Sequence, residues 1–291
     1  MGRNEVIVGI DGDKTHRAAL YWAADEATRR GVGLRIIHAY LSEWPDTDLA
    51  LRRAARALEP LAEEVLAAAV NDIHAYTPDL PVTAAVERSG PASALIGAAD
   101  PGDLLVVGSR HDAAGLTATL LGSTAQQVAL HSTTSVAVVR GRDDTVGTDA
   151  TGPVVVGVDG SAASRTALGV AFEAAAARGA RLSIVRAFRP GSPPWPRDVA
   201  PSLLRDVTTT RAAHLKELGL AAAAWSEKFP DVGVDMFVLP GYAAEVLDDA
   251  TGNAQLVVVG SRGHGGFAGL LLGSVGLHLI HHADCPVLIA R

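Results

Sequence analysis

Cysteine, lysine and extended apolar runs are scarce in this sequence of 291 residues. The single cysteine, Cys285, excludes an internal disulfide and fits a reducing compartment. The net charge is −7 and no run of basic residues occurs, so nucleic acid is not an expected partner. No apolar stretch approaches the roughly 20 residues of a membrane helix, and no signal segment precedes the first apolar run. We therefore expect a soluble, cytoplasmic protein without membrane insertion.

Aromatic residues are also few, although the chain is rich in other apolar residues. Hydrophobic residues make up 48% of the sequence and aromatic residues only 4%. Alanine, valine and leucine must then fill the interior, which favours helices packed closely on a sheet. The length is sufficient for two domains, each with its own core.

The sequence contains an internal repeat with a period of about 150 residues. Three segments recur: residues 5–12 (EVIVGIDG) as 153–160 (PVVVGVDG), residues 100–110 (DPGDLLVVGSR) as 253–262 (NAQLVVVGSR), and residues 135–140 (SVAVVR) as 286–291 (PVLIAR). We interpret the chain as a tandem duplication. The predicted domains are residues 1–141 and 153–291, joined by a linker over 142–152 that is rich in Asp, Gly and Thr.

Each half alternates predicted strands with predicted helices. The strands are expected near 6–10, 34–39, 82–87, 104–107 and 136–139, and near 154–158, 182–187, 234–239, 256–259 and 287–290. The helices are expected near 15–30, 48–76 and 91–99 and from Ser123, and near 161–178, 199–228, 243–251 and 274–282. The central strands are continuously apolar, which is typical of a parallel sheet covered on both faces. The pattern predicts an α/β fold whose ligands bind at the carboxyl ends of the strands.

The stretch from Gln255 to Ser274 is the most informative part of the chain. An apolar strand is followed by a glycine-dense loop and then by a Gly-Ser pair that opens a helix, with the spacing G-x2-G-x9-G-S at Gly260, Gly263, Gly273 and Ser274. Glycines allow positive φ and a close approach of the backbone to a ligand. A helix N-terminus offers free N–H groups to an anion. The loop therefore predicts a phosphate site, in which Ser274 is either the helix cap or a phosphate ligand.

This loop, placed after a buried strand in a duplicated chain, resembles the nucleotide loop of the universal stress protein family, and its ATP-binding branch in particular. The resemblance covers both halves. It implies two tandem Rossmann-like domains of the adenine nucleotide alpha hydrolase-like type, each an open five-stranded parallel sheet of order 3-2-1-4-5 flanked by helices. It also implies a stress-response regulator that binds ATP, with Mg²⁺ as an accompanying ion, and a homodimer that acts on a regulatory protein partner.

The resemblance also assigns site residues. In the second half it implies binding by Asp159, Ala187, Gly260, Gly263, Gly273, Ser274 and Val275, and in the first half by Asp11, Gly108, Gly122 and Ser123. Asp159 has the alternative role of a turn residue or helix cap. Ala187 would contribute its backbone to the adenine, because the family position faces the base.

The first half departs from the motif. His111 stands where the second half has Gly263, and the loop from Gly108 to Gly122 is one residue longer than its counterpart. If Gly263 needs positive φ, a histidine there costs about 1 kcal/mol. We expect the first site to bind nucleotide more weakly than the second, or not at all.

Other functional classes are less well supported by the sequence. No Gly-x4-Gly-Lys-[ST] loop and no nucleophile with a positioned base occur, so at most slow ATP hydrolysis is expected. Gly263–Ala268 formally matches the dinucleotide motif G-x-G-x-x-A, but it follows a late strand rather than the first. A nucleotide-free scaffold and a binder of AMP or cyclic AMP remain open. Protein purified without adenine nucleotide and indifferent to ATP would favour the scaffold.

Several further residues invite a functional role. His278, His281 and His282 share helical spacing, and we interpret them as structural or solvated rather than as metal ligands. Arg110 and Arg262 follow the strand-end glycines and either assist a phosphate or project into solvent. Trp44 and Trp195 lie in equivalent loops and either cover the crevice or anchor their own loops.

Overall fold

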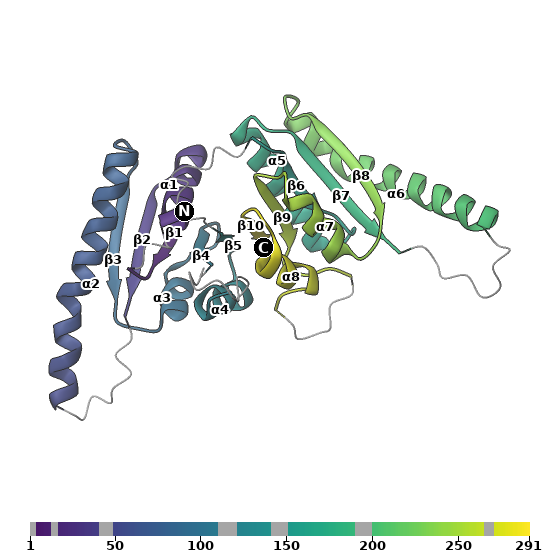
Figure 1. Ribbon diagram of the computed structural model, residues 1–291. Coiled ribbons are helices and arrows are strands. Elements are labelled where there is room, and N and C mark those ends of the chain that lie inside the picture. Colours follow the sequence, from purple (N-terminus) through teal and green to yellow (C-terminus); the bar gives the residue numbers. More distant parts are fainter. Residues whose placement is uncertain are drawn as a thin grey trace. The chain divides into compact units, whose positions relative to one another are not determined.

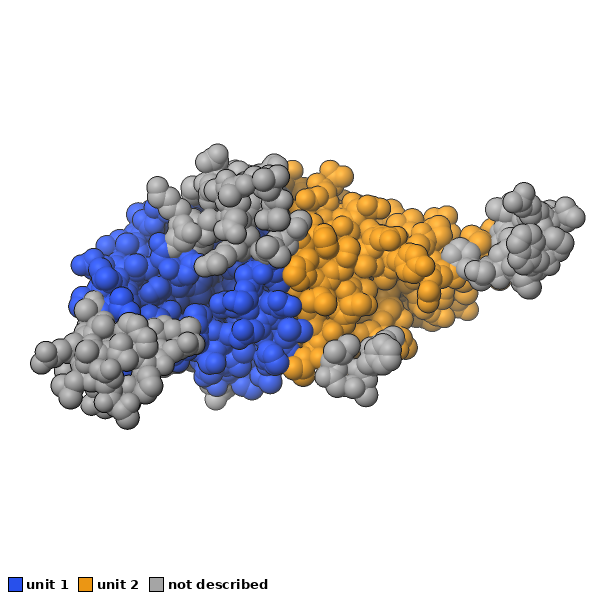
Figure 2. Space-filling model, turned by 60° about the horizontal axis from the view of Figure 1, so that its bottom comes forward, with its two compact units in different colours: residues 1–149 blue, residues 150–291 orange. Residues whose placement is uncertain are grey.

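A computed structural model gives the fold of the chain (Figure 1). It describes residues 4–12, 17–40, 49–109, 121–140, 151–189, 200–264 and 271–291, and only the backbone of 49–57 and 200–206. The chain divides into two compact units, residues 1–149 and 150–291, coloured blue and orange in Figure 2. Each unit contains its own set of parallel β-strands and helices.

Unit 1 is a parallel α/β layer structure. Its elements are β1 (Val6–Ile10), α1 (Arg17–Arg30), β2 (Leu34–Ala39), α2 (Leu49–Tyr76), β3 (Val82–Glu87), α3 (Pro91–Ala98), β4 (Leu104–Gly108), α4 (Ser123–His131) and β5 (Ser135–Val139). The strands lie side by side in the order β3-β2-β1-β4-β5, and every pair is parallel. Helices α1 and α2 cover one face, and α3 and α4 cover the other.

Unit 2 repeats this arrangement. Its elements are β6 (Val154–Gly157), α5 (Ala162–Arg178), β7 (Leu182–Phe188), α6 (Ala200–Lys228), β8 (Val234–Pro240), α7 (Ala243–Thr251), β9 (Leu256–Gly260), α8 (Ser274–His282) and β10 (Val287–Ala290). The strand order is β8-β7-β6-β9-β10, again with parallel pairs. Helices α5 and α6 pack on one face, and α7 and α8 on the other. The predicted order 3-2-1-4-5 is therefore confirmed in both units.

The interior consists mainly of small aliphatic residues, as the composition predicts. The central strands β4 and β9 are buried at four consecutive positions each, which explains why their sequences are continuously apolar. Trp22 and Phe172 are the largest fully buried side chains among the residues that the structure describes. No helix in the described part of the chain is long and apolar enough to cross a membrane.

Each sheet reverses its strand order between the first and fourth strands of the unit. In unit 1 this point lies between β1 and β4, and in unit 2 between β6 and β9. The carboxyl ends of these strands lead into the two segments that carry the predicted site residues: the Asp-Gly turns after β1 and β6, and the glycine-containing segments after β4 and β9. The fold thus places both segments at the position where open α/β sheets bind ligands.

Candidate functional site

Asp159 joins the two segments at the switch point of unit 2. Its Oδ1 accepts a hydrogen bond from the amide of Ser161 (2.9 Å), which closes the turn into α5. Its Oδ2 accepts a hydrogen bond from the amide of His264 (2.9 Å), in the segment that follows β9. The carboxylate is therefore both a turn residue and an anchor for the start of the glycine loop. Ser161 is the N-cap of α5, because its hydroxyl accepts from the amide of Ser164.

The environment of Asp159 favours its ionised form. Partial burial raises the pKa of the carboxyl, but hydrogen bonds from the hydroxyl and amide of Ser161, from the amide of His264 and from the hydroxyl of Ser164 outweigh burial and lower the pKa to about 2. The side chain is still 44% exposed, so it keeps accessible lone pairs. Asp159 can thus hold the loop and accept a further hydrogen bond from a ligand.

We predict that replacing Asp159 with asparagine weakens the link between α5 and the loop. Because the folded-state pKa lies below the unfolded-state value, the ionised carboxylate stabilises the fold above about pH 4 and loses this contribution as the pH falls towards about 2. Urea unfolding should show a difference in the free energy of unfolding between wild type and Asp159→Asn. This difference should be constant between about pH 5 and about pH 7 and should become smaller below about pH 4. The exposed Asp231→Asn serves as control, and a difference independent of pH would contradict the assignment.

Gly260 and Gly263 allow a close approach of the backbone and do not adopt positive φ. None of Gly260, Gly263 and Gly273 has a positive φ, so the condition under which a histidine at the position of Gly263 would cost about 1 kcal/mol is not met in unit 2. A Cβ atom at Gly260 would lie 2.6 Å from the carbonyl carbon of Ala163, and a Cβ atom at Gly263 would lie 2.5 Å from Oδ2 of Asp159. The first glycine lets α5 pack on β9, and the second lets the loop reach the carboxylate.

Positive φ occurs instead in the Asp-Gly turns. Gly12 has a φ of 86° and Gly160 a φ of 91°, so both units use the same left-handed turn after the first strand. In unit 2 this turn directs the chain from the end of β6 into α5.

The N-terminus of α8 lies beside the start of the glycine loop that follows β9. Gly273 is the N-cap residue, with φ −73° and ψ 160°, and no side chain caps the helix. Ser274 is therefore the first helical residue rather than the cap, and the residue is exposed. The amide of Gly273 donates to the carbonyl of Ser261 (2.8 Å), and the first intrahelical bond runs from the amide of Leu277 to the carbonyl of Gly273. The amides of residues 274–276 precede that bond and have no backbone partner among the described residues, so they are the candidate donors to an anion.

Ala187 and Val275 are the remaining predicted residues of unit 2. Ala187 lies near the carboxyl end of β7, and Val275 is the second residue of α8. All predicted site residues of unit 2 thus lie at strand or helix ends, or in the segments that adjoin them, at the same edge of the sheet.

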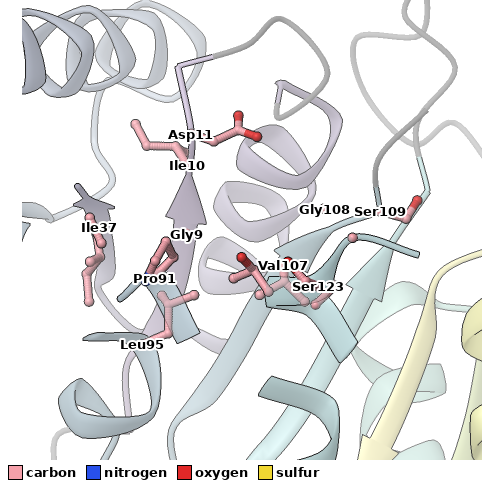
Figure 3. Close-up of a pocket in the computed structure, with 14 residues that line it drawn as sticks. Gly9, Ile10, Asp11, Ile37, Pro91, Leu95, Val107, Gly108, Ser109 and Ser123 are labelled. Carbon is pink, nitrogen blue, oxygen red and sulfur yellow. The ribbon is translucent and has the colours of Figure 1, made fainter. Parts of the chain in front are cut away.

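Unit 1 has a cavity of about 230 Å³ at the equivalent edge (Figure 3). It is lined by the ends of β1, β2 and β4 and by the first turns of α3 and α4, namely Gly9, Ile10, Asp11, Ile37, Ala39, Pro91, Leu95, Val107, Gly108, Ser109, Gly122, Ser123, Thr124 and Ala125. The structure therefore brings together all four residues predicted for this unit. Gly122 is the N-cap of α4, in an extended conformation and without a side-chain cap, as Gly273 is for α8.

Ser109 is a lining residue that the sequence analysis missed. Its side chain is buried, and its Oγ has no hydrogen-bond partner among the described residues. A buried hydroxyl without a partner is costly unless a ligand or water satisfies it. The available signal was the Gly-Ser-Arg triplet at the end of the fourth strand, which recurs as residues 260–262.

The other candidate residues do not form a second site in the described structure. His278 contacts Asp248 (Nε2 to Oδ2, 3.4 Å) and stacks on His282, and no group of three or more potential metal ligands occurs among the described residues. Arg262 is exposed beside the loop. Arg110, His111, Trp44 and Trp195 lie outside the described residues.

Comparison with known proteins agrees with this architecture. The family model "Universal stress protein family" matches twice, over residues 2–140 and 151–291. A universal stress protein of Mycobacterium tuberculosis H37Rv is 32% identical over 302 aligned residues, covering 98% of this chain and 96% of that protein. One from Mycolicibacterium smegmatis is 33% identical over 296 aligned residues, with the same coverage.

A solved structure supports the fold. The crystal structure of a universal stress protein from Archaeoglobus fulgidus covers 100% of this chain and 99% of its own, with a TM-score of 0.67 and 17% identity. Two family matches in tandem, relatives above 30% identity over nearly the full length and the repeated sheet order lead to one conclusion: the chain belongs to the universal stress protein family, as a member with two tandem domains.

Proposed function

We propose that this protein is an ATP-binding regulator of the stress response and that unit 2 holds the nucleotide. The observation that carries the proposal is the anchored start of the loop after β9. The carboxylate of Asp159 accepts a hydrogen bond from the amide of His264, and the carbonyl of Ser261 accepts one from the amide of Gly273. These two bonds hold the first turn of α8 at the switch point, where the amides of residues 274–276 have no backbone partner among the described residues. Such a preorganised helix N-terminus suits a phosphate group.

We propose one orientation for the adenylate on the described residues. The phosphates would lie on the amides of 274–276 with the hydroxyl of Ser274, at the helix N-terminus, where the dipole favours an anion. Asp159 would accept a hydrogen bond from the ribose or the base, and the backbone of Ala187 would face the base. Mg²⁺, when bound with ATP, would rest chiefly on phosphate oxygens, because Mg²⁺ commonly takes few protein ligands.

Unit 1 is proposed to bind nucleotide more weakly, or not at all. The sequence places His111 at the position of Gly263. In unit 2 that position approaches the aspartate too closely for a side chain, so a histidine cannot make the same link without displacing the carboxylate.

We expect one tight ATP site per chain. Calorimetric titration of ATP into the nucleotide-free full chain should give a stoichiometry near one, and mass spectrometry of material released from freshly purified protein should identify an adenine nucleotide. Two equally tight sites would contradict the assignment to unit 2. Purified protein that carries no nucleotide and does not bind added ATP would favour a nucleotide-free scaffold function instead of ATP binding.

AMP or cyclic AMP is the second candidate ligand. Three amides and one hydroxyl at the start of α8 are enough to surround one phosphate group, so a monophosphate could use the same donors. Competition of AMP and cyclic AMP against ATP distinguishes the ligands. In either case we propose binding without rapid turnover, in a homodimer whose nucleotide state is read by a regulatory protein partner.

A further inference from the structure

An exposed apolar corner is present in unit 2 and has no counterpart at the equivalent described positions of unit 1. Phe237, Leu239 and Tyr242, at the end of β8 and the start of α7, are 42%, 37% and 61% exposed. We name Leu239 and Tyr242 the β8–α7 corner. Exposed apolar side chains gathered in one place often mark an interaction site.

The strand register places this corner beside the proposed nucleotide site. In unit 1, Ile37 and Ala39 line the cavity, and Ile37 pairs with Gly9 of β1. In unit 2, Val185 pairs with Gly157 of β6, so Ala187 occupies the position of Ala39. Leu239 of β8 pairs with Ala187. Because paired residues of adjacent parallel strands lie on the same face of the sheet, Leu239 extends the crevice surface outward from Ala187.

Tyr242 lies at the same edge. It is the N-cap residue of α7, the position that Gly90 occupies before α3. The next residue in unit 1, Pro91, lines the cavity (Figure 3). The guanidinium carbon of Arg189, two residues beyond Ala187, lies 5.6 Å from the centre of the Tyr242 ring. This cation–π contact favours a fixed ring position beside the end of β7.

The corresponding positions of unit 1 have different chemistry. Glu87 pairs with Ala39 where Leu239 pairs with Ala187, and Gly90 replaces Tyr242. Unit 1 thus has a carboxylate where unit 2 has the aliphatic side chain of Leu239, and it has a glycine where unit 2 has the aromatic ring of Tyr242. A flat, apolar ligand group would contact the surface of unit 2 and not that of unit 1.

We infer that Leu239 and Tyr242 form a base-binding shelf that holds the purine of the nucleotide in unit 2. This inference rests on the proposed function, which puts a base at Ala187. The occupant is the nucleobase because the corner adjoins the proposed base position, whereas the phosphate donors lie on α8. A purine stacks on aromatic rings and packs against aliphatic side chains, which contributes affinity without reading the phosphates.

The test exchanges the shelf for its unit 1 counterparts in the full chain, as Leu239→Glu combined with Tyr242→Gly. Isothermal titration calorimetry measures the affinity for ATP and for inorganic tripolyphosphate, which lacks the base. The double variant should bind ATP about tenfold or more weakly and tripolyphosphate within about twofold of wild type. The matched control is Leu220→Glu, at a 71% exposed leucine of α6 on the opposite face of the sheet, and both of its affinities should stay unchanged.

Each other outcome has a definite meaning. A double variant that binds ATP as tightly as wild type overturns the shelf and leaves the proposed function standing. A double variant that loses ATP and tripolyphosphate equally also overturns it, because the residues would then support the whole site. Wild-type protein that binds neither ligand overturns the proposed function and the shelf with it. Thermal unfolding midpoints verify that the variants fold, as expected for exposed positions.

Discussion

Replacing Gly273 with valine is expected to weaken ATP binding about hundredfold while leaving the fold intact. The backbone of Gly273, at φ −73° and ψ 160°, suits any residue, and a Cβ atom there would lie 3.5 Å from the Cα atom of Arg262. The substitution therefore costs little stability. The methyl groups of the valine, however, lie at the start of α8, where they would hinder the contact of the phosphate with the amides. Loss of one or two charge-assisted hydrogen bonds corresponds to a change of that size.

Calorimetry with ATP and thermal unfolding, measured on the same preparations, test this prediction. The matched control is Gly122→Val, which alters the equivalent residue of unit 1 and should leave the tight site of unit 2 unaffected. A folded Gly273→Val protein with unchanged ATP affinity would refute the proposal that the first turn of α8 binds the phosphates.

Replacing Gly260 with alanine is expected to destabilise unit 2 by about 1–3 kcal/mol. The added Cβ atom would lie 2.6 Å from the carbonyl carbon and 2.7 Å from the carbonyl oxygen of Ala163, so the first turn of α5 must move away from β9. That turn follows the Asp159 turn directly, and its displacement also loosens the anchor of the loop.

The unit 1 counterpart is the control for this substitution. A Cβ atom on Gly108 would lie 3.6 Å from the Cβ atom of Ala19, an ordinary contact, so Gly108→Ala should be nearly neutral. Urea unfolding of both variants measures the difference. Equal stabilities would show that the helix can shift without cost and that the glycine at 260 is not required for packing.

The fold could be predicted from the sequence to within one or two residues at most element ends. Continuous apolar runs such as residues 104–107 and 256–259 identify strands covered on both faces, and the duplication allows each half to support the assignment of the other. The strand order came from the family resemblance, because periodicity alone does not define which strands are neighbours.

The site was only partly predictable. The spacing of Gly260, Gly263 and Gly273 indicated the loop, but it did not indicate that Gly263 approaches Asp159, 104 positions earlier in the chain, so closely that a Cβ atom there would displace the carboxylate. Long-range contacts of this kind leave no local signal. The same is true of Leu239, whose relevance appears only through its pairing with Ala187.

The fusion of two units in one chain has an evolutionary consequence. In a symmetric dimer of identical single-unit chains, every substitution appears in both copies, so both crevices must change together. Here Glu87 and Leu239, and Gly90 and Tyr242, differ between copies that share one sheet order. Covalent linkage thus allows the two crevices of one chain to differ at positions that a symmetric dimer of identical chains must keep the same.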